Sequence, residues 1–176
     1  MTVEETLCFG ALICAMAGAV ADVRSRRIPN RLTVSALVSG FALHLILQGL
    51  KGLEMSAAGA LIAGGAFFLL FVVGGMGAGD VKLMGAVGAW VGAAHALQAL
   101  AVTAIGGGVL AIGWTLICGQ VGSTFRNMAE LIRFHLASGL RRHPDLNLAR
   151  SSSIRLPYGP AIAMGPLYLI CQRFWG

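Results

Sequence analysis

The sequence predicts an all-α membrane protein with about six transmembrane helices. Of the 176 residues, 57% are hydrophobic and 11% are charged, whereas a soluble domain has about 25% charged residues. The mean hydropathy is +0.79, and apolar runs of about 20 residues, the length that crosses a bilayer, follow one another along the chain. We expect residues 1–176 to form a single integral-membrane domain.

The first apolar run covers residues 6–21. Glu4 and Glu5 precede it, and arginines follow it from Arg24 onward. A signal peptide has its positive charge before the apolar stretch, so this run is predicted to be a retained membrane span. Because basic flanks stay in the cytoplasm, we expect the N-terminus to lie outside.

Residues 32–50 and 55–73 predict the second and third spans. Pro29 fixes the turn before the second run, and Asn30 is a candidate helix cap. The outer hairpin between the two runs is predicted at a short segment made of Gly49, Lys51, Gly52 and Glu54.

The fourth and fifth spans lie between Lys82 and Cys118. This apolar stretch is too long for one helix across a core of about 30 Å, so it must fold back. His95 and Gln98 are its strongly polar residues and mark the predicted outer turn. The sixth span is predicted over residues 156–175. Three prolines interrupt it: Pro157, Pro160 and Pro166.

Residues 119–156 form the one long polar segment, which is predicted to be a cytoplasmic loop. Its arginines would contact anionic lipid head groups if the segment holds an amphipathic helix at the membrane surface. A solvated helix packed on the rest of the protein is an equally good interpretation. Apolar residues recur at helical spacing at Phe125, Met128, Ile132, Leu136 and Leu140.

The net charge of +6 would suggest nucleic-acid binding in a soluble protein. Under the six-span topology, however, all basic residues except Lys51 and Arg173 fall on the inside, as the positive-inside rule requires. We therefore predict no nucleic-acid partner. The cysteines form no C-x-x-C pair and the sequence has no H-E-x-x-H, so we predict neither a metal nor a cofactor.

Two carboxylates stand at the same predicted depth, near the cytoplasmic edge of the membrane. Asp22 ends the first span and Asp80 begins the fourth. Carboxylates at such margins are costly unless they serve a site or have a partner, although either aspartate could instead face water or pair with Arg24 or Lys82. Two carboxylates held together do not both ionise readily. One can hold a proton while the other activates water, which is the chemistry of aspartic peptidases.

The glycines before Asp80 favour such an arrangement. Gly77 and Gly79 have no Cβ, so the backbone there can adopt conformations closed to other residues and neighbouring helices can approach closely. Lys82 could tune the two carboxylates or extend to the membrane surface.

Three segments resemble motifs of the prepilin leader peptidases, a family of GxGD-type aspartic peptidases. Residues 77–83, GAGDVKL, resemble the GxGD signature, and residues 22–30, DVRSRRIPN, resemble the motif of the first aspartate. Residues 157–165, PYGPAIAMG, resemble the last-helix motif. The three occur in the family's order and at the predicted cytoplasmic side.

The resemblance implies that Asp22 and Asp80 are the catalytic residues, without assigning which is the base and which the acid. The implied active-site loop contains Gly77, Gly79 and Lys82. The residues implied to support the substrate or the structure are Pro29, Asn30, Pro157, Tyr158, Gly159 and Pro160. Unpaired backbone groups of the last motif would face the site, unless its prolines merely kink the helix.

The resemblance also implies a substrate and a location. Members of this family cleave the short basic leader from type IV-like pilin or pseudopilin precursors, at the cytoplasmic face of the bacterial inner membrane. Larger members carry an insert with paired cysteines and methylate the new N-terminus. This chain has no such insert and no paired cysteines. It therefore resembles the compact tight-adherence (Flp pilus) type, and we predict no methyltransferase activity. The alternative is a small transporter or assembly subunit that uses both aspartates as a proton or cation path.

Overall fold

The computed structural model describes residues 2–117 and 157–175, with isolated positions between them. These residues form the helices α1 (Val3–Ser25), α2 (Asn30–Val72), α3 (Ala78–Ile117) and α5 (Gly159–Trp175). The predicted all-α class is confirmed. By length and composition, α1, α2 and α3 can each cross a membrane. The amphipathic helix expected within 119–156 falls outside the described residues, apart from isolated positions.

Helix α1 begins at a capping box and ends just beyond Asp22. The Thr2 hydroxyl accepts a hydrogen bond from the Glu5 N–H, and the Glu5 carboxylate accepts one from the Thr2 N–H, which satisfies two N–H groups that a helix leaves free at its start. At the other end Arg26 adopts a left-handed conformation, with φ of 51°, and its N–H donates to the Asp22 carbonyl. The last turn of α1 therefore carries Asp22.

Helix α2 consists of two segments that fold back on each other at Gly49. Gly49 has φ of 67° and ψ of −155°, a conformation that favours glycine. A Cβ on Gly40 would lie 3.3 Å from the carbonyl carbon of Ala89, and the Ser56 hydroxyl donates to the carbonyl oxygen of Ala89 at 2.6 Å. A straight helix would hold Gly40 and Ser56 about 24 Å apart. The break falls within the predicted hairpin segment.

Helix α3 has the same construction, but its break is at Gly92 and not at the predicted turn. Gly92 has φ of 72° and ψ of 174°. His95 and Gln98 lie three and six residues later, inside the second segment of the helix, and their side chains hydrogen-bond at 3.3 Å. The polarity of those two residues was misleading, because backbone conformation decides where the chain reverses and only glycine adopts this one readily.

The break at Gly92 leaves carbonyl groups at the end of the first segment of α3 without helical partners. Side chains of α2 hydrogen-bond to these carbonyl groups. The Ser56 hydroxyl bonds to the Ala89 carbonyl, and His44 Nε2 bonds to the Trp90 carbonyl at 3.0 Å. Close packing accompanies these bonds, since a Cβ on Gly88 would overlap the backbone of α2. The two hairpins α2 and α3 therefore dock backbone to backbone.

Helix α5 begins later than the predicted sixth span, at Gly159. Pro157 lies before the helix, and Pro160 occupies its first turn, where a missing N–H costs nothing. Of the three prolines expected to interrupt this span, Pro166 lies in the helix interior, fully buried. The earlier prolines thus set where α5 starts.

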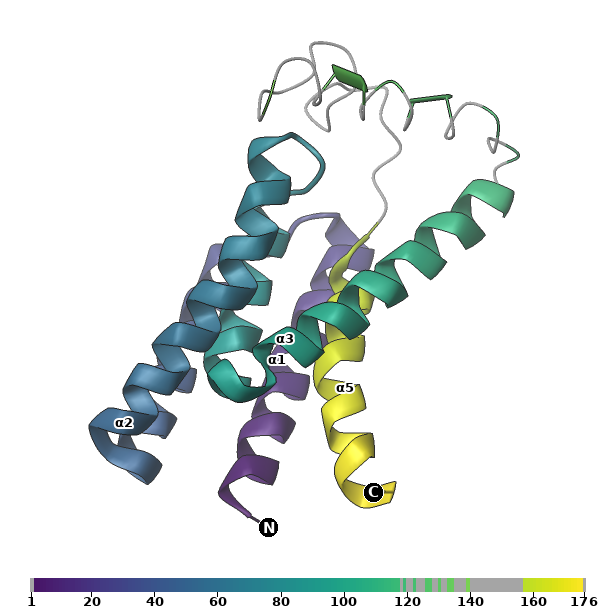
Figure 1. Ribbon diagram of the computed structural model, residues 1–176. Helices are drawn as coiled ribbons and strands as arrows, with labels where there is room; N and C mark the ends of the chain where they lie inside the picture. The colour runs from purple at the N-terminus through teal and green to yellow at the C-terminus, as the bar shows by residue number, and fades with distance from the viewer. Residues whose placement is uncertain are drawn as a thin grey trace.

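The ends of the helices divide between two sides of the molecule. Figure 1 shows both chain termini together at one end, which we call the terminal end. The α1–α2 connection, the α2–α3 connection and the start of α5 lie at the opposite end, which we call the aspartate end. Asp22, in the last turn of α1, and Asp80, in the first turn of α3, both lie at the aspartate end.

Candidate active site

The antiparallel packing of α1 on α3 brings Asp22 and Asp80 together. A Cβ on Gly18 would lie 2.5 Å from Leu83 Cδ2. Asp22 lies one turn beyond Gly18, and Asp80 lies about one turn before Leu83, so both are displaced from this contact toward the same end of the bundle. The two carboxylates lie close enough for the charge of Asp22 to act on Asp80.

Asp22 is held by the first residue of α5. Its side chain is 7% exposed, and its Oδ2 accepts a buried hydrogen bond from the Gly159 N–H at 2.9 Å. A Cβ on Gly159 would lie 2.7 Å from the Ala19 Cα and 3.0 Å from the Asp22 Cβ. The missing side chain therefore lets the α5 backbone approach α1 closely enough to make the bond.

Asp80 lies in the first turn of α3 and is half-buried. Its Oδ2 accepts a hydrogen bond from the Gly77 N–H at 3.2 Å. The free N–H groups at a helix N-terminus favour a carboxylate in this position. Both aspartates are thus fixed by backbone N–H donors, and the donor to Asp22 comes from a distant part of the chain.

Gly77 and Gly79 act through the space they leave. The positive φ in this segment is at Gly74 (85°), so the expectation of special backbone conformations at Gly77 and Gly79 was wrong. A Cβ on Gly77 would lie 2.9 Å from Asp80 Oδ2, and one on Gly79 would lie 3.2 Å from the Ile28 Cβ. Gly77 lies in the turn before α3, whereas Gly79 lies in the helix itself.

Lys82 and Asn30 form a hydrogen bond at 2.8 Å, from the Lys82 Nζ to the Asn30 Oδ1. Lys82 is an exposed residue of α3 and is not part of a loop. Asn30 is the first residue of α2 and not its cap, because Pro29 occupies the cap position. The bond therefore links the start of α2 to the start of α3, in place of the Lys82–Asp22 pair considered from the sequence.

The last-helix segment reaches both aspartates. While Gly159 donates to Asp22, the charge of Asp80 acts on the half-buried Tyr158. The Tyr158 ring packs against Gly107, where a Cβ would lie 3.0 Å from Cε1. The Tyr158 carbonyl is paired with a helical N–H. Of the unpaired backbone groups expected here, the Gly159 N–H is the one that faces an aspartate.

Two contact residues of the site were not singled out in the sequence. Ile28 packs on Gly79, and Gly107 packs on Tyr158. Ile28 lies within the segment 22–30 that resembles the first-aspartate motif, so the motif contained a signal for it. Gly107 is one of many glycines in an apolar helix, and nothing in its neighbourhood distinguishes it.

This arrangement has the parts needed for acid–base catalysis by two carboxylates. Two acidic groups from separate helices share a partly buried space, where the ionisation of one disfavours that of the other. Such a pair can hold one proton between them and poise a water molecule. Among the residues that the structure describes, no three His, Cys, Asp or Glu side chains are grouped so as to hold a metal ion.

A model of the type IV leader peptidase family matches residues 8–112. The matched range contains Asp22 and Asp80 and ends before the segment that carries Gly159. No curated protein and no solved structure matches the chain.

Proposed function

Because the chain belongs to the type IV leader peptidase family, we propose that it is a membrane aspartic endopeptidase that removes the leader peptide from type IV-like (Flp) prepilins or pseudopilins. The observation that carries the aspartic assignment is the convergence of Asp22 and Asp80 at one end of the bundle, each with a backbone N–H donor. Incubation of the purified chain with a pilin-type precursor, followed by mass spectrometry of the new N-terminus, tests this function. An uncut precursor would contradict it.

The proposed reaction is hydrolysis of one peptide bond. The ionised aspartate takes a proton from water, and the resulting hydroxide attacks the scissile carbonyl carbon. The protonated aspartate gives its proton to the carbonyl oxygen. When the tetrahedral intermediate breaks down, a proton passes to the leaving amine and the carboxyl product forms. The backbone N–H groups of Gly159 and Gly77 orient the two carboxylates.

We extend the proposal to a six-span topology in the inner membrane, with the aspartate end in the cytoplasm. The breaks at Gly49 and Gly92 support it, because they give α2 and α3 two segments each. The exposed arginines at the α1–α2 connection support the orientation, and they are positioned to meet anionic head groups. These residues are Arg24, Arg26, Arg27 and Arg31.

A membrane-impermeant thiol reagent tests this topology in intact cells. In a background without native cysteines, Lys51→Cys is expected to be labelled, because Lys51 lies close to the Gly49 turn, which is outside in the proposed topology. Arg27→Cys is expected to stay unlabelled until the cells are opened. Labelling of Arg27→Cys in intact cells, with Lys51→Cys protected, would show that the orientation is the reverse of the proposed one.

We also propose that the enzyme cleaves without methylating its product. The sequence has no C-x-x-C pair and no cysteine-rich insert of the kind found in the larger, methylating members of the family. Incubation of cleaved pilin with labelled S-adenosylmethionine and the purified chain tests the proposal. We expect no transfer of label to the pilin N-terminus, and clear transfer would refute this part of it.

The Lys82–Asn30 bond is expected to hold the start of α3, which carries Asp80, against the start of α2, which the short α1–α2 connection joins to the turn that carries Asp22. Lys82→Met and Asn30→Ala should each lower the cleavage rate by less than about tenfold, because exposed polar pairs contribute little. The double variant should be no slower than the slower single variant, since both remove the same bond. Additive losses in the measured rates would show that the two residues act independently.

A further inference from the structure

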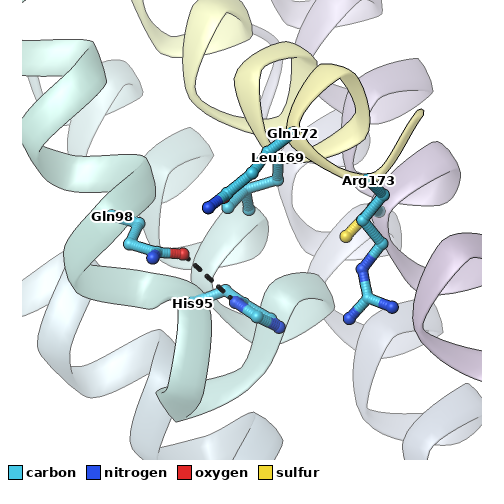
Figure 2. A pocket seen from close by; sticks show the side chains of 6 residues that line it. His95, Gln98, Leu169, Gln172 and Arg173 are labelled. Atoms are coloured by element: carbon cyan, nitrogen blue, oxygen red, sulfur yellow. Dashed lines mark hydrogen bonds between the residues drawn. The ribbon is translucent and has the colours of Figure 1, made fainter. Parts of the chain in front are cut away.

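A cavity of about 270 Å³ lies at the terminal end, far from the aspartates. Figure 2 shows four polar side chains around it, with His95 and Gln98 on α3 facing Gln172 and Arg173 on α5. His95 Nδ1 and Gln98 Oε1 lie 3.3 Å apart. The complete lining is Cys8, His95, Gln98, Leu169, Gln172 and Arg173.

The chemistry of the lining is divided between apolar and polar groups. Cys8 and Leu169 are 2% and 3% exposed and belong to the core of the bundle. Among the remaining lining residues, a guanidinium and two side-chain amides offer hydrogen-bond donors, and the imidazole of His95 bonds to the Gln98 amide. Donors beside an apolar wall suit an anionic, oxygen-rich group attached to an apolar body, and a guanidinium is the side chain best suited to phosphate.

The Arg173 guanidinium forms an ion pair with Glu4 in the first turn of α1. A guanidinium carries five N–H donors in a planar fork, so it can bind a carboxylate and a second anion together. The Glu4 pair fixes the side chain at the cavity, where it would otherwise be free to move. Arg173 is thereby pre-positioned to bind an anion.

In the proposed six-span topology the cavity lies near the membrane surface, where lipid phosphates are found. Phe174 and Trp175 follow Arg173 directly and are 65% and 94% exposed. Aromatic residues at the end of a membrane helix are typical of the boundary between acyl chains and head groups. The volume is slightly below the range of about 300–1,000 Å³ that is typical of sites for whole small molecules, so it suits a head group.

We propose that this cavity binds the phosphate group of a phospholipid from the leaflet at the terminal end, with Arg173 as the main contact and the amides of Gln98 and Gln172 as further donors. In the six-span topology this is the outer leaflet. The site is separate from Asp22 and Asp80 and does not depend on the proposed peptidase activity.

Native mass spectrometry of the full chain in detergent tests the ligand class. Three probes separate the sources of the phosphate: phosphatidylglycerol, diacylglycerol and free glycerol phosphate. We expect saturable binding of phosphatidylglycerol, no retained diacylglycerol and at least tenfold weaker binding of glycerol phosphate. Equal binding of diacylglycerol would overturn the phosphate contact, and equal binding of glycerol phosphate would overturn the choice of a lipid.

Variants test the assigned contact. Arg173→Gln is expected to weaken phosphatidylglycerol binding about tenfold or more, in keeping with the strength of charge-assisted hydrogen bonds. Lys51→Gln removes a positive charge that does not line the cavity and should leave the affinity unchanged. Glu4→Gln removes the ion pair that positions Arg173 but keeps the guanidinium, so binding should weaken less than in Arg173→Gln. The proposal fails if Arg173→Gln binds phosphatidylglycerol as tightly as the unaltered chain does. It also fails if Glu4→Gln loses as much affinity as Arg173→Gln.

Discussion

Asp22→Asn and Asp80→Asn are each expected to abolish cleavage of a pilin-type precursor. Asparagine has the shape of aspartate but can neither accept a proton from water nor deliver one, so either change removes half of the acid–base pair. General acid–base catalysis contributes about 10²–10⁴-fold per group, so the cleavage rate of each purified variant should fall by at least about 10²-fold. The measurement is the initial rate of leader release, with unprocessed precursor accumulating in cells that express either variant.

The control for these substitutions is Asp145→Asn, because Asp145 is the only other aspartate in the sequence. It should cleave at the normal rate. Normal processing by the Asp22 or Asp80 variant would exclude the two-carboxylate mechanism. If the unaltered chain cleaves nothing, yet passes protons or cations in a way that both aspartates control, the transporter alternative is favoured.

Gly159→Ala is expected to have the next largest effect, although it leaves every charged group in place. The added Cβ would lie 2.7 Å from the Ala19 Cα and 3.0 Å from the Asp22 Cβ, so α5 must move away from α1. That movement stretches the bond from the Gly159 N–H to Asp22 Oδ2. Since a displacement of about 1 Å in a catalytic group can cost about 10²-fold in rate, we expect a loss of that order.

The thermal stability of Gly159→Ala must be measured together with its cleavage rate, because a variant that does not fold would also fail to cleave. Thermal unfolding in detergent should show a variant that still folds, with a lower midpoint. Gly108→Ala is the matched control, since a Cβ at Gly108 would meet nothing within 4 Å beyond the neighbouring backbone of its own helix. It should match the unaltered chain in both measurements. Full activity in Gly159→Ala would show that the contact between α5 and Asp22 is not needed.

Three signals in the sequence together predicted that Asp22 and Asp80 meet. Apolar runs of known length and the placement of arginines predict one depth and one side for both aspartates, the glycines before Asp80 predict a close approach of helices, and the family resemblance implies the pair. In the structure the two aspartates lie at the same end of the bundle. The partner of Asp22 could not be found in this way. Gly159 lies 137 positions from Asp22, and no local pattern identifies which backbone N–H will meet a carboxylate.

The turn of α3 shows a second limit of the sequence. The outer turn was predicted at His95 and Gln98 because they are polar, but the chain reverses at Gly92. Several glycines in this stretch could adopt a positive φ, and the choice among them depends on which carbonyl groups α2 can satisfy. Ser56 provides one such partner across the helix interface, which is a tertiary contact that no local sequence pattern encodes.

The most direct test of the account asks whether positions 22 and 80 share one site. Asp22→Cys and Asp80→Cys are combined in a background without native cysteines, and the protein is treated in the membrane with a short bifunctional thiol reagent. We expect rapid cross-linking of this pair, and none for Asp22→Cys combined with Lys51→Cys, whose positions lie at opposite ends of the bundle. Failure of the first pair to cross-link, while each cysteine reacts singly, would contradict the shared site.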